Sequence, residues 1–308
     1  MAAIRIENLT KTYRAGWRGK ETTAVRNLSV EVNEGEIFGF LGPNGAGKTT
    51  TIHILLNLIR PTDGAAYLFD CPVTESEVHR RLGYLPETVN LHDYYRGRAL
   101  LEFYAALCGL PAESRQARVS QLLKLLKLED AADKVVARYS KGMAQRIGFA
   151  QALLHDPDLL ILDEPTASLD PVGRKEFRDI LLDLKRRGKT VLISSHILSE
   201  VESVCDRVAI LQTGELKRAG TLAELSAGRC TIITVKSLPP DVLNALTTTA
   251  VQITLAQGQF TIRCPDEPLH QLVGDLLRQN NIEIVRTQAE SQSLEEIFFS
   301  SIEAPPRL

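Results

Sequence analysis

The sequence predicts an α/β protein built on a buried parallel sheet and followed by a smaller α+β domain. Three short apolar runs, at residues 37–41, 159–162 and 191–193, have the length and composition of strands that are buried on both faces. Apolar residues at helical spacing lie between these runs, so strands and helices alternate as a parallel sheet requires. After residue 226 the pattern changes to shorter, closely spaced strands and helices, which predicts the second domain.

Composition limits the classes of protein to consider. The 308 residues suffice for one large and one small domain, and 44% hydrophobic with 24% charged residues is typical of globular proteins. A net charge of −2 gives no basic field, so nucleic acid is not expected as a partner. The five cysteines form no CxxC pair, which argues against a disulfide framework or zinc site and fits a reducing cytosol. No apolar run reaches about 18 residues, so a membrane role needs another polypeptide.

The first apolar run leads directly into GPNGAGKTT, which fits the phosphate-binding pattern G-x-x-x-x-G-K-[ST]. Glycines let successive backbone N–H groups turn toward phosphate oxygens, and the helix predicted to follow adds its positive N-terminal end. We expect Lys48 to reach the β- and γ-phosphates and Thr49 to offer its hydroxyl to Mg²⁺. The alternative is a glycine-rich turn that only caps a helix. The residues of this phosphate loop are Gly42, Pro43, Asn44, Gly45, Ala46, Gly47, Lys48, Thr49 and Thr50.

A mainly helical stretch separates the first run from the second and predicts an inserted helical subdomain, at about 88–156. Within it, YSKGMAQR (139–146) precedes a helical pattern that ends at a His-Asp-Pro sequence. Ser140 and Gly142 therefore lie near a helix N-terminus, whose free N–H groups and dipole attract anions. This segment is a second candidate for phosphate binding. The alternative is that Ser140 serves only as an N-cap.

The second and third runs each place ionisable side chains at their carboxyl ends, the edge where open α/β sheets bind ligands. Asp163 is suited to hold Mg²⁺ through water, whereas Glu164 can orient an attacking water and accept its proton. A solvated acidic turn is the alternative for this pair. We interpret His196, beside a phosphate loop and two acids, as a γ-phosphate sensor rather than a structural histidine.

The carboxyl-terminal part predicts a separate unit. Thr221 and Glu224 have the spacing of a capping box that starts a helix, and Ala227-Gly228 then breaks the chain. We place the domain boundary there, giving a first domain at 1–226 and a second at 229–308. The order of strands and helices predicted for the second domain is βαββαβ, which is ferredoxin-like. Its elements are a strand at 230–235, a helix at 241–246, a strand at 251–255, a turn at 257–258, a strand at 260–263, a helix at 269–278 and a strand at 282–285.

Together the motifs resemble those of the ATP-binding cassette (ABC) ATPases across residues 4–225, and they occur in that family's order. Residues 42–50 resemble the Walker A loop, 139–143 the signature segment, 163–164 Walker B and 168–170 the D-loop. The resemblance implies a phosphate-loop NTPase fold, a RecA-like core with antiparallel strands and an inserted helical subdomain. The catalytic residues it implies are Lys48, Glu164 and His196, and the metal-site residues are Thr49, Asp163 and Glu87. The nucleotide-binding residues it implies outside the phosphate loop are Tyr13, whose ring resembles the one that stacks on adenine, with Ser140, Lys141, Gly142, Met143 and Asp170.

The resemblance also implies a function: the ATP-hydrolysing subunit of a membrane transporter, with ATP and Mg²⁺ as cofactors. Two subunits would sandwich each ATP between the phosphate loop of one and the signature segment of the other, as a homodimer or a heterodimer. Integral membrane permease subunits on separate chains would hold the protein at the cytoplasmic face of the inner membrane. The segments YLPE, YSKGM and SLEEIF (293–298) resemble the drug- and polysaccharide-exporter branch. In the stretch 88–110, expected to face the permease, the contact candidates are Asp93, Tyr94, Tyr95 and Arg96.

The sequence departs from the family pattern at four positions. Glu87 and Met143 lie where glutamine is common, and Lys141 and Ser168 lie where glycine is common. Two other functions were weighed against the transporter subunit. A non-transport ABC ATPase, regulating translation or DNA repair, usually carries two cassettes or a basic extension, and this chain has one phosphate loop and no basic tract. A phosphate-loop kinase would leave the signature segment, the D-loop and His196 unexplained.

Overall fold

The computed structural model describes residues 1–14, 21–226, 229–247, 249, 251–256, 258–264, 267–291 and 294–303. It divides into two units, Met1–Ala219 and Gly220–Leu308. Ala227 and Gly228, where we place the boundary from sequence, lie outside the described residues, so that boundary stays a prediction.

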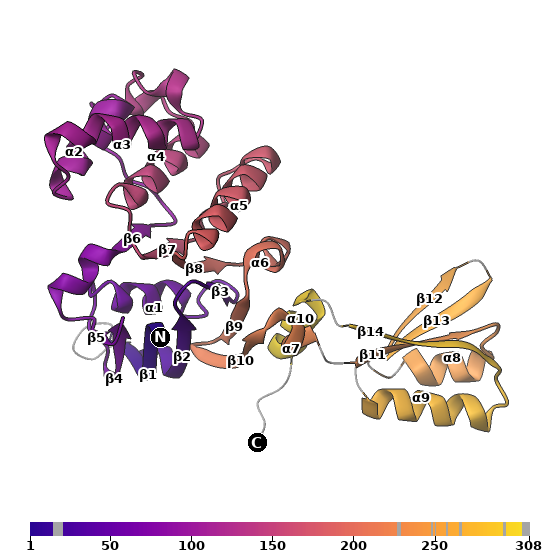
Figure 1. Cartoon of the computed structure of the whole chain (residues 1–308). Helices are drawn as coiled ribbons and strands as arrows, with labels where there is room; N and C mark the ends of the chain where they lie inside the picture. The colour runs from indigo at the N-terminus through magenta and orange to yellow at the C-terminus, as the bar shows by residue number, and fades with distance from the viewer. Residues whose placement is uncertain are drawn as a thin grey trace. The chain divides into compact units, whose positions relative to one another are not determined.

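The first unit is organised around a six-stranded sheet with the order β10-β9-β3-β8-β7-β6 (Figure 1). The pairs β6–β7, β7–β8, β8–β3 and β3–β9 are parallel. Every residue of β3, β7 and β8 is buried, which confirms the three apolar runs as central strands. The strands of this sheet are β3 (Ile37–Leu41), β6 (Leu82–Leu85), β7 (Leu159–Asp163), β8 (Thr190–Ser195), β9 (Arg207–Gln212) and β10 (Glu215–Thr221).

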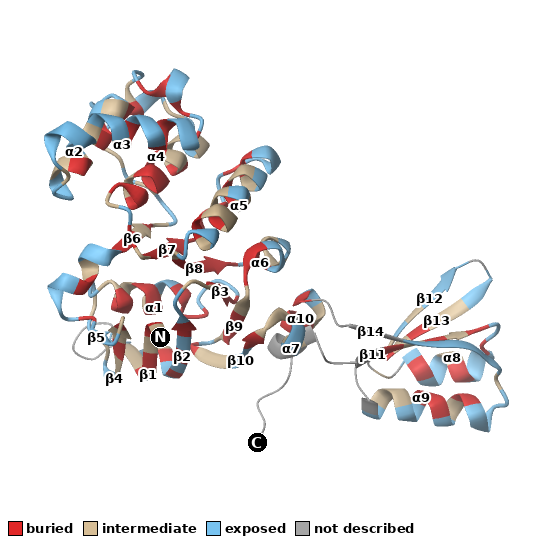
Figure 2. Cartoon of the chain, in the orientation of Figure 1, coloured by how far each residue is buried: buried red, intermediate tan, exposed pale blue. Residues whose placement is uncertain are grey.

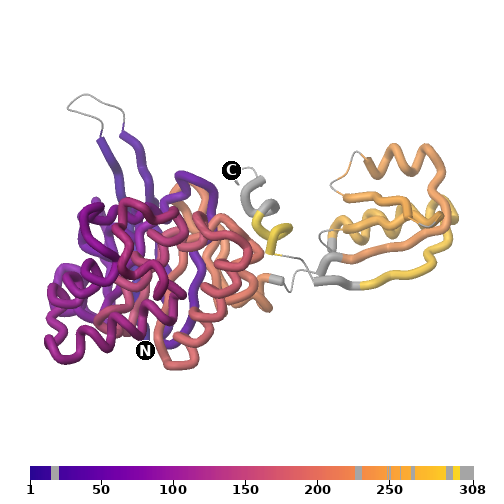
Figure 3. Tube along the Cα trace, turned by 90° about the horizontal axis from the view of Figure 1, so that it is seen from above, coloured from indigo at the N-terminus to yellow at the C-terminus, as the bar shows by residue number. Residues whose placement is uncertain are grey.

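A second, antiparallel sheet has the order β2-β1-β4-β5. Its strands are β1 (Ala2–Arg14), β2 (Glu21–Asn33), β4 (Asp63–Leu68) and β5 (Cys71–Pro72). Apolar residues of this sheet form one buried cluster with the parallel sheet and with α1 (Lys48–Leu55), and Figure 2 shows the burial concentrated there. In Figure 3 the ends of β1 and β2 nearest to 15–20 form a two-stranded arm that extends beyond the neighbouring helices.

Helices lie between the strands as the α/β pattern predicts. The chain between β6 and β7 carries α2 (Gly97–Leu107), α3 (Ala112–Leu125) and α4 (Lys141–Leu153), which contact one another, and α4 also packs against β6. Short 3₁₀ turns are η1 (Ser76–Arg81), η2 (Glu129–Ala131) and η3 (Val136–Arg138). Beyond β7 and β8 follow α5 (Pro171–Arg186) and α6 (Leu198–Val204), which contact each other. Because α5 and α6 start close to the acid pair and His196, their packing bears on the site.

The second unit contains a four-stranded sheet with the order β12-β13-β11-β14, in which all neighbours are antiparallel. With two helices between the strands, this is the ferredoxin-like arrangement that the βαββαβ order predicts. One side of the sheet forms an apolar core with the helices, which includes Ile233, Val242 and Val273. The elements are α7 (Leu222–Ser226), β11 (Arg229–Val235), α8 (Pro240–Thr247), β12 (Gln252–Ala256), β13 (Gln259–Cys264), α9 (Glu267–Gln279), β14 (Ile284–Ser291) and α10 (Leu294–Glu303).

Details of this unit differ from the expectation in two places. The last strand, β14, begins two residues later than predicted and continues to Ser291, because pairing with β11 extends it through exposed polar residues. The final helix, α10, was not predicted.

The capping box of α7 is confirmed by reciprocal bonds: Thr221 N donates to Glu224 Oε2 at 2.8 Å, and Glu224 N donates to Thr221 Oγ1 at 3.0 Å. Gln257 of the predicted turn and Ser293 of the SLEEIF segment lie outside the described residues.

Candidate nucleotide-binding site

The phosphate loop joins β3 to α1 and lines a cavity of about 520 Å³. Two of its glycines are required by close backbone contacts. A Cβ on Gly42 would lie 2.5 Å from Leu211 O, and one on Gly47, whose φ is +100°, would lie 2.5 Å from Ala24 O. Residues 43–50 all line the cavity together with Thr22, Thr23 and Ala24 of β2, whereas Gly42 is not a lining residue. Backbone packing therefore fixes the course of the loop along the cavity.

Lys48 is almost fully buried, and its ammonium contacts loop carbonyls and an acid. Nζ donates to Gly42 O at 2.6 Å and lies 3.5 Å from the carboxylate oxygen Oε1 of Glu164. Thr49, the next residue of α1, donates from Oγ1 to Asp163 Oδ2 at 3.0 Å. Asp163 is 1% exposed at the end of β7. The structure thus joins the loop's lysine and threonine to the two acids predicted from sequence.

Glu164 occupies an unusual backbone conformation, with φ of +46°, in the left-handed region that non-glycine residues rarely adopt. Its side chain is buried, and the two carboxylate oxygens have different partners. Oε1 faces Lys48, and Oε2 lies 2.8 Å from His196 Nδ1. His196 is half exposed, and both residues line the cavity with the phosphate loop. A carboxylate, an imidazole and an ammonium therefore meet at one point.

Of the two other residues predicted for this site, Glu87 lines the cavity and Tyr13 does not. Glu87 is exposed and lines the cavity after β6. Burial, and to a smaller extent the charges of Asp163 and Glu87, raise the pKa of Tyr84 to about 12, so its phenol stays neutral. Tyr13 does not line the cavity, but it pairs in β1 with Thr22, which does. The Tyr13 ring is 43% exposed, with Lys11 Nζ 5.1 Å from its centre.

The signature residues line a different cavity, of about 570 Å³, which shares no lining residue with the first. Ser140 is the N-cap of α4 and its Oγ accepts from Met143 N at 3.2 Å, so the capping role is real. Asp170 caps α5 in the same way, accepting from Gly173 N at 2.8 Å. This cavity brings together Ser140, Lys141, Gly142 and Met143 with Ser168, Leu169 and Asp170 of the D-loop.

Two basic side chains of the signature cavity are paired with one acid that also lines it. Glu176 contacts Lys127 Nζ at 2.7 Å and Arg146 Nη2 at 2.9 Å. The hydrogen bond from Lys127, together with the contact to Arg146, holds the pKa of Glu176 below its usual value. Asp163, Glu164 and His196 do not line this cavity. It therefore offers a helix N-terminus without the residues expected to take part in hydrolysis.

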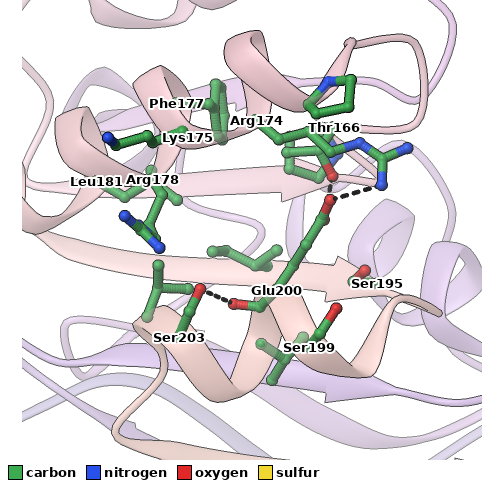
Figure 4. A pocket seen from close by; sticks show the side chains of 15 residues that line it. Thr166, Arg174, Lys175, Phe177, Arg178, Leu181, Ser195, Ser199, Glu200 and Ser203 are labelled. Carbon is green, nitrogen blue, oxygen red and sulfur yellow. Dashed lines mark hydrogen bonds and ion pairs between the residues drawn. The ribbon is translucent and has the colours of Figure 1, made fainter.

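A third cavity, of about 240 Å³, lies between α5 and α6, beside the loop that follows Glu164 (Figure 4). Glu200 of α6 accepts a hydrogen bond from Thr166 Oγ1 and lies 3.3 Å from Arg174 Nη1. Arg174 Nε in turn donates to Leu169 O at 3.1 Å. Glu200 therefore connects the helix that follows His196 to the loop after Glu164 and to the D-loop.

The candidate contacts for a permease are held on an ordered loop before α2. The backbone is fixed by bonds from Val136 N to Tyr95 O at 2.9 Å and from Ala137 N to Asp93 O at 3.3 Å. The ring of Tyr95 stacks on Phe103, with centroids 5.8 Å apart, and Tyr94 is 96% exposed. Arg96 donates from Nη1 to Asp133 O at 2.9 Å. Among the helices that the structure describes, none combines the length and the apolar run that a membrane crossing needs.

The first cavity suits a nucleotide with Mg²⁺. Thr49 and Asp163 present neighbouring oxygen donors, the type that Mg²⁺ prefers. Among the described residues there is no group of three or more histidine, cysteine or acidic side chains that could hold a metal ion. Backbone amides and the buried Lys48 provide the matching anion site. The arrangement can hold a triphosphate with Glu164 beside its end.

Ser194 is a functional candidate that the sequence reasoning missed. It lies on β8 directly opposite Asp163, it is fully buried, and its hydroxyl donates to Asp163 Oδ1 and accepts from Glu164 N. The only sequence signal was a polar residue inside an apolar strand. Its importance depends on register between strands that are about 30 residues apart, which the sequence pattern does not contain.

Comparison with known proteins identifies the family. The sequence model of the ABC transporter family matches residues 25–167. YxlF of Bacillus subtilis, an uncharacterised ABC transporter ATP-binding protein, is 36% identical over 308 residues, covering 98% of this chain and all of that protein. An uncharacterised ABC transporter ATP-binding protein of Nostoc sp. is 47% identical, covering 73% of this chain and 68% of its own length. The bacitracin transport ATP-binding protein BcrA of Bacillus licheniformis is 41% identical, covering 69% of this chain and 68% of its own.

A solved structure gives the same answer for the fold. The dimeric, post-hydrolysis ATP-binding cassette MJ0796, bound to ADP and Pi, matches with a TM-score of 0.66 and 27% identity, covering 71% of this chain and 98% of that one. Subunits of this family bind and hydrolyse ATP, dimerise and act with membrane permease components. The chain therefore belongs to the ABC family, as the ATP-binding, ATP-hydrolysing subunit of an ABC transporter.

Proposed function

We propose that two copies of this cassette, or this cassette and a near relative, close on ATP so that each nucleotide contacts the phosphate loop of one and the signature segment of the other. One observation carries the proposal: the hydrolytic residues and the signature residues line two cavities with no lining residue in common. A single chain thus presents two incomplete halves. Binding ATP favours the closed pair, and hydrolysis removes the γ-phosphate contacts that hold it closed.

Each residue of the first cavity has a role in this proposal. Lys48 binds the β- and γ-phosphates, and Glu164 orients the attacking water and accepts its proton. His196 contacts the γ-phosphate and, through its 2.8 Å contact, holds the Glu164 carboxylate toward it. Thr49 and Asp163 hold Mg²⁺, with Glu87 at the cavity edge. When bound, Mg²⁺ neutralises charge on the phosphate oxygens.

The transport reaction that we propose is export through separate membrane subunits, at the cytoplasmic face of the membrane. BcrA, whose name describes bacitracin transport, supports a transporter, and the YLPE and YSKGM segments support export. The exposed Tyr94 and the loop that carries it are the proposed permease contact.

A mixing experiment tests the composite site. Lys48→Ala removes the phosphate contact of one half, and Ser140→Arg blocks the helix end of the other half. Each variant alone should be inactive, because every site in its dimer has one defect. Mixing the two in equal amounts should restore about a quarter of wild-type turnover, since half of randomly paired dimers contain one intact site.

The measurement is steady-state ATP hydrolysis, with dimer formation followed by size-exclusion chromatography in ATP. If Ser140→Arg alone retains turnover and dimerises with ATP, the signature segment does not complete the site. Absence of recovery in mixtures that do form dimers also contradicts the composite arrangement.

A further inference from the structure

The hydroxyl of Ser194 lies between the two acids of the site and has no role in the function proposed above. Ser194 is 0% exposed, so it cannot touch a nucleotide, and it acts only through its neighbours. Its Oγ donates to Asp163 Oδ1 and accepts from Glu164 N at 3.1 Å. One buried side chain thus contacts the side chain of the first acid and the backbone of the second.

The first contact fixes the rotation of the Asp163 carboxylate. Ser194 takes Oδ1, and Thr49 takes Oδ2 at 3.0 Å. Because each oxygen has its own donor, Oδ2 stays turned toward Thr49, the residue of the phosphate loop. Strand register makes this possible, since Asp163 of β7 and Ser194 of β8 are directly paired.

The second contact stabilises a strained turn. At Glu164 the chain adopts a φ of +46°, in the left-handed region that strains a residue other than glycine. The N–H of Glu164 is shared between Ser194 O and Ser194 Oγ, each at 3.1 Å. In this turn the Glu164 side chain faces Lys48 and His196 while Asp163 faces Thr49.

We infer that Ser194 is a positioning residue for ATP hydrolysis, whose hydroxyl sets the relative orientation of Asp163 and Glu164 so that one faces the metal and the other the attacking water. The inference rests on the proposed roles of these two acids. Ser194 contacts both Asp163 and Glu164, so loss of its hydroxyl changes the positions of both acids together.

Ser194→Ala tests the inference with two readouts. The turnover number should fall about ten- to hundred-fold, the range for residues that support metal ligands from behind, while the KM for ATP changes little because the phosphate loop is intact. In the presence of a non-hydrolysable ATP analogue, the Mg²⁺ concentration at half-maximal thermal stabilisation should rise by about the same factor.

Thr190→Val is the matched control. Thr190 is buried at the other end of β8, and its Oγ1 accepts from a backbone N–H, that of Gly35, at 2.9 Å. The variant also removes a buried hydroxyl that serves a backbone amide, so it reports the cost to stability alone. We expect it to lower the melting temperature without changing turnover at a temperature where it is folded. Ser194→Cys, which keeps the volume but is a weak donor, replaces Ser194→Ala if the alanine variant does not fold.

The outcomes separate the inference from the proposed function. Wild-type turnover and an unchanged Mg²⁺ midpoint in a folded Ser194 variant would overturn the role of Ser194 while leaving the composite site untouched. An equal loss of turnover in Thr190→Val would overturn it as well, because the effect would then be general destabilisation. Failure of Lys48→Ala and Ser140→Arg to restore turnover in mixed dimers would instead remove the proposed function.

Discussion

The phosphate-loop cavity and the signature cavity have similar volumes, about 520 and 570 Å³, but their polar groups are used differently. In the first, Lys48 and His196 both contact Glu164, and the three residues come from three separate segments. In the second, Ser140 bonds to its own helix, and Glu176 pairs with the nearest cations. The comparison indicates that the first cavity gathers the groups suited to chemistry, whereas the second offers the start of a helix, to which in our proposal the nucleotide comes from another subunit.

The largest effect that this comparison predicts is at Glu164. Glu164→Gln keeps the shape but removes the base, so hydrolysis should slow by about 10²- to 10⁴-fold. ATP binding should persist, because the phosphate loop is unchanged, and the ATP-bound dimer should accumulate. Single-turnover hydrolysis and size-exclusion chromatography in ATP measure the two effects.

A matched variant in the other cavity sharpens this prediction. Glu176→Gln changes the same side chain in the same way, but Glu176 only pairs with Lys127 and Arg146. It should leave the rate of the chemical step within a few-fold of wild type, since ion pairs of this kind contribute about 1 kcal/mol or less. Equal losses in both variants would contradict the division of labour between the cavities.

A smaller effect is expected at the edge of the first cavity. If the Tyr13 ring stacks on adenine, Tyr13→Ala should weaken ATP binding by roughly 5- to 150-fold, the range measured for loss of one aromatic platform under a base. Tyr13→Phe keeps the ring and should bind as the wild type does. Equilibrium titration with a fluorescent ATP analogue checks both. If Tyr13→Ala binds ATP with unchanged affinity, the ring does not stack on adenine and contributes only to the β1–β2 arm.

The residues of the two cavities show what could be predicted from the sequence and what could not. The phosphate loop was predictable because its nine residues are contiguous, so spacing alone specifies the geometry. Glu164, Asp163 and His196 were predictable because each ends an apolar strand, and the ends of parallel strands share one edge. Ser194 was not, because its contacts depend on pairing between β7 and β8. The αL conformation of Glu164 and the link from Glu200 through Arg174 to Leu169 also depend on tertiary contacts.

The same limit applies to the second unit. Its βαββαβ order was readable from alternating apolar residues, but β14 is exposed and polar over most of its length, and its extent is decided by pairing with β11. The apolar residues of α10 fit a short buried strand as well as a helix, so the sequence pattern alone does not identify this helix.

The smallest predicted effect concerns the attachment of the signature helix to the sheet. His155, just beyond α4, places Nε2 3.1 Å from Leu82 O of β6, a geometry that suits a neutral ring donating from Nε2. Its Nδ1 is buried without a hydrogen-bond partner, so protonation there would bury an unpaired charge. Burial accordingly lowers the pKa of His155, although the Leu82 hydrogen bond opposes the shift.

The sign of the pH effect follows from this lowered pKa. Above the unfolded value, about 6.5, the ring is neutral in both states and costs nothing. As pH falls below about 6.5, the unfolded chain takes up a proton that the folded protein does not, so the free energy of unfolding decreases. His155→Gln can keep a donor toward Leu82 O without a titrating group, and it should reduce the loss of melting temperature between pH 7.5 and pH 5.5 by about one to a few degrees. An identical loss in both proteins would mean that groups other than His155 set the acid sensitivity.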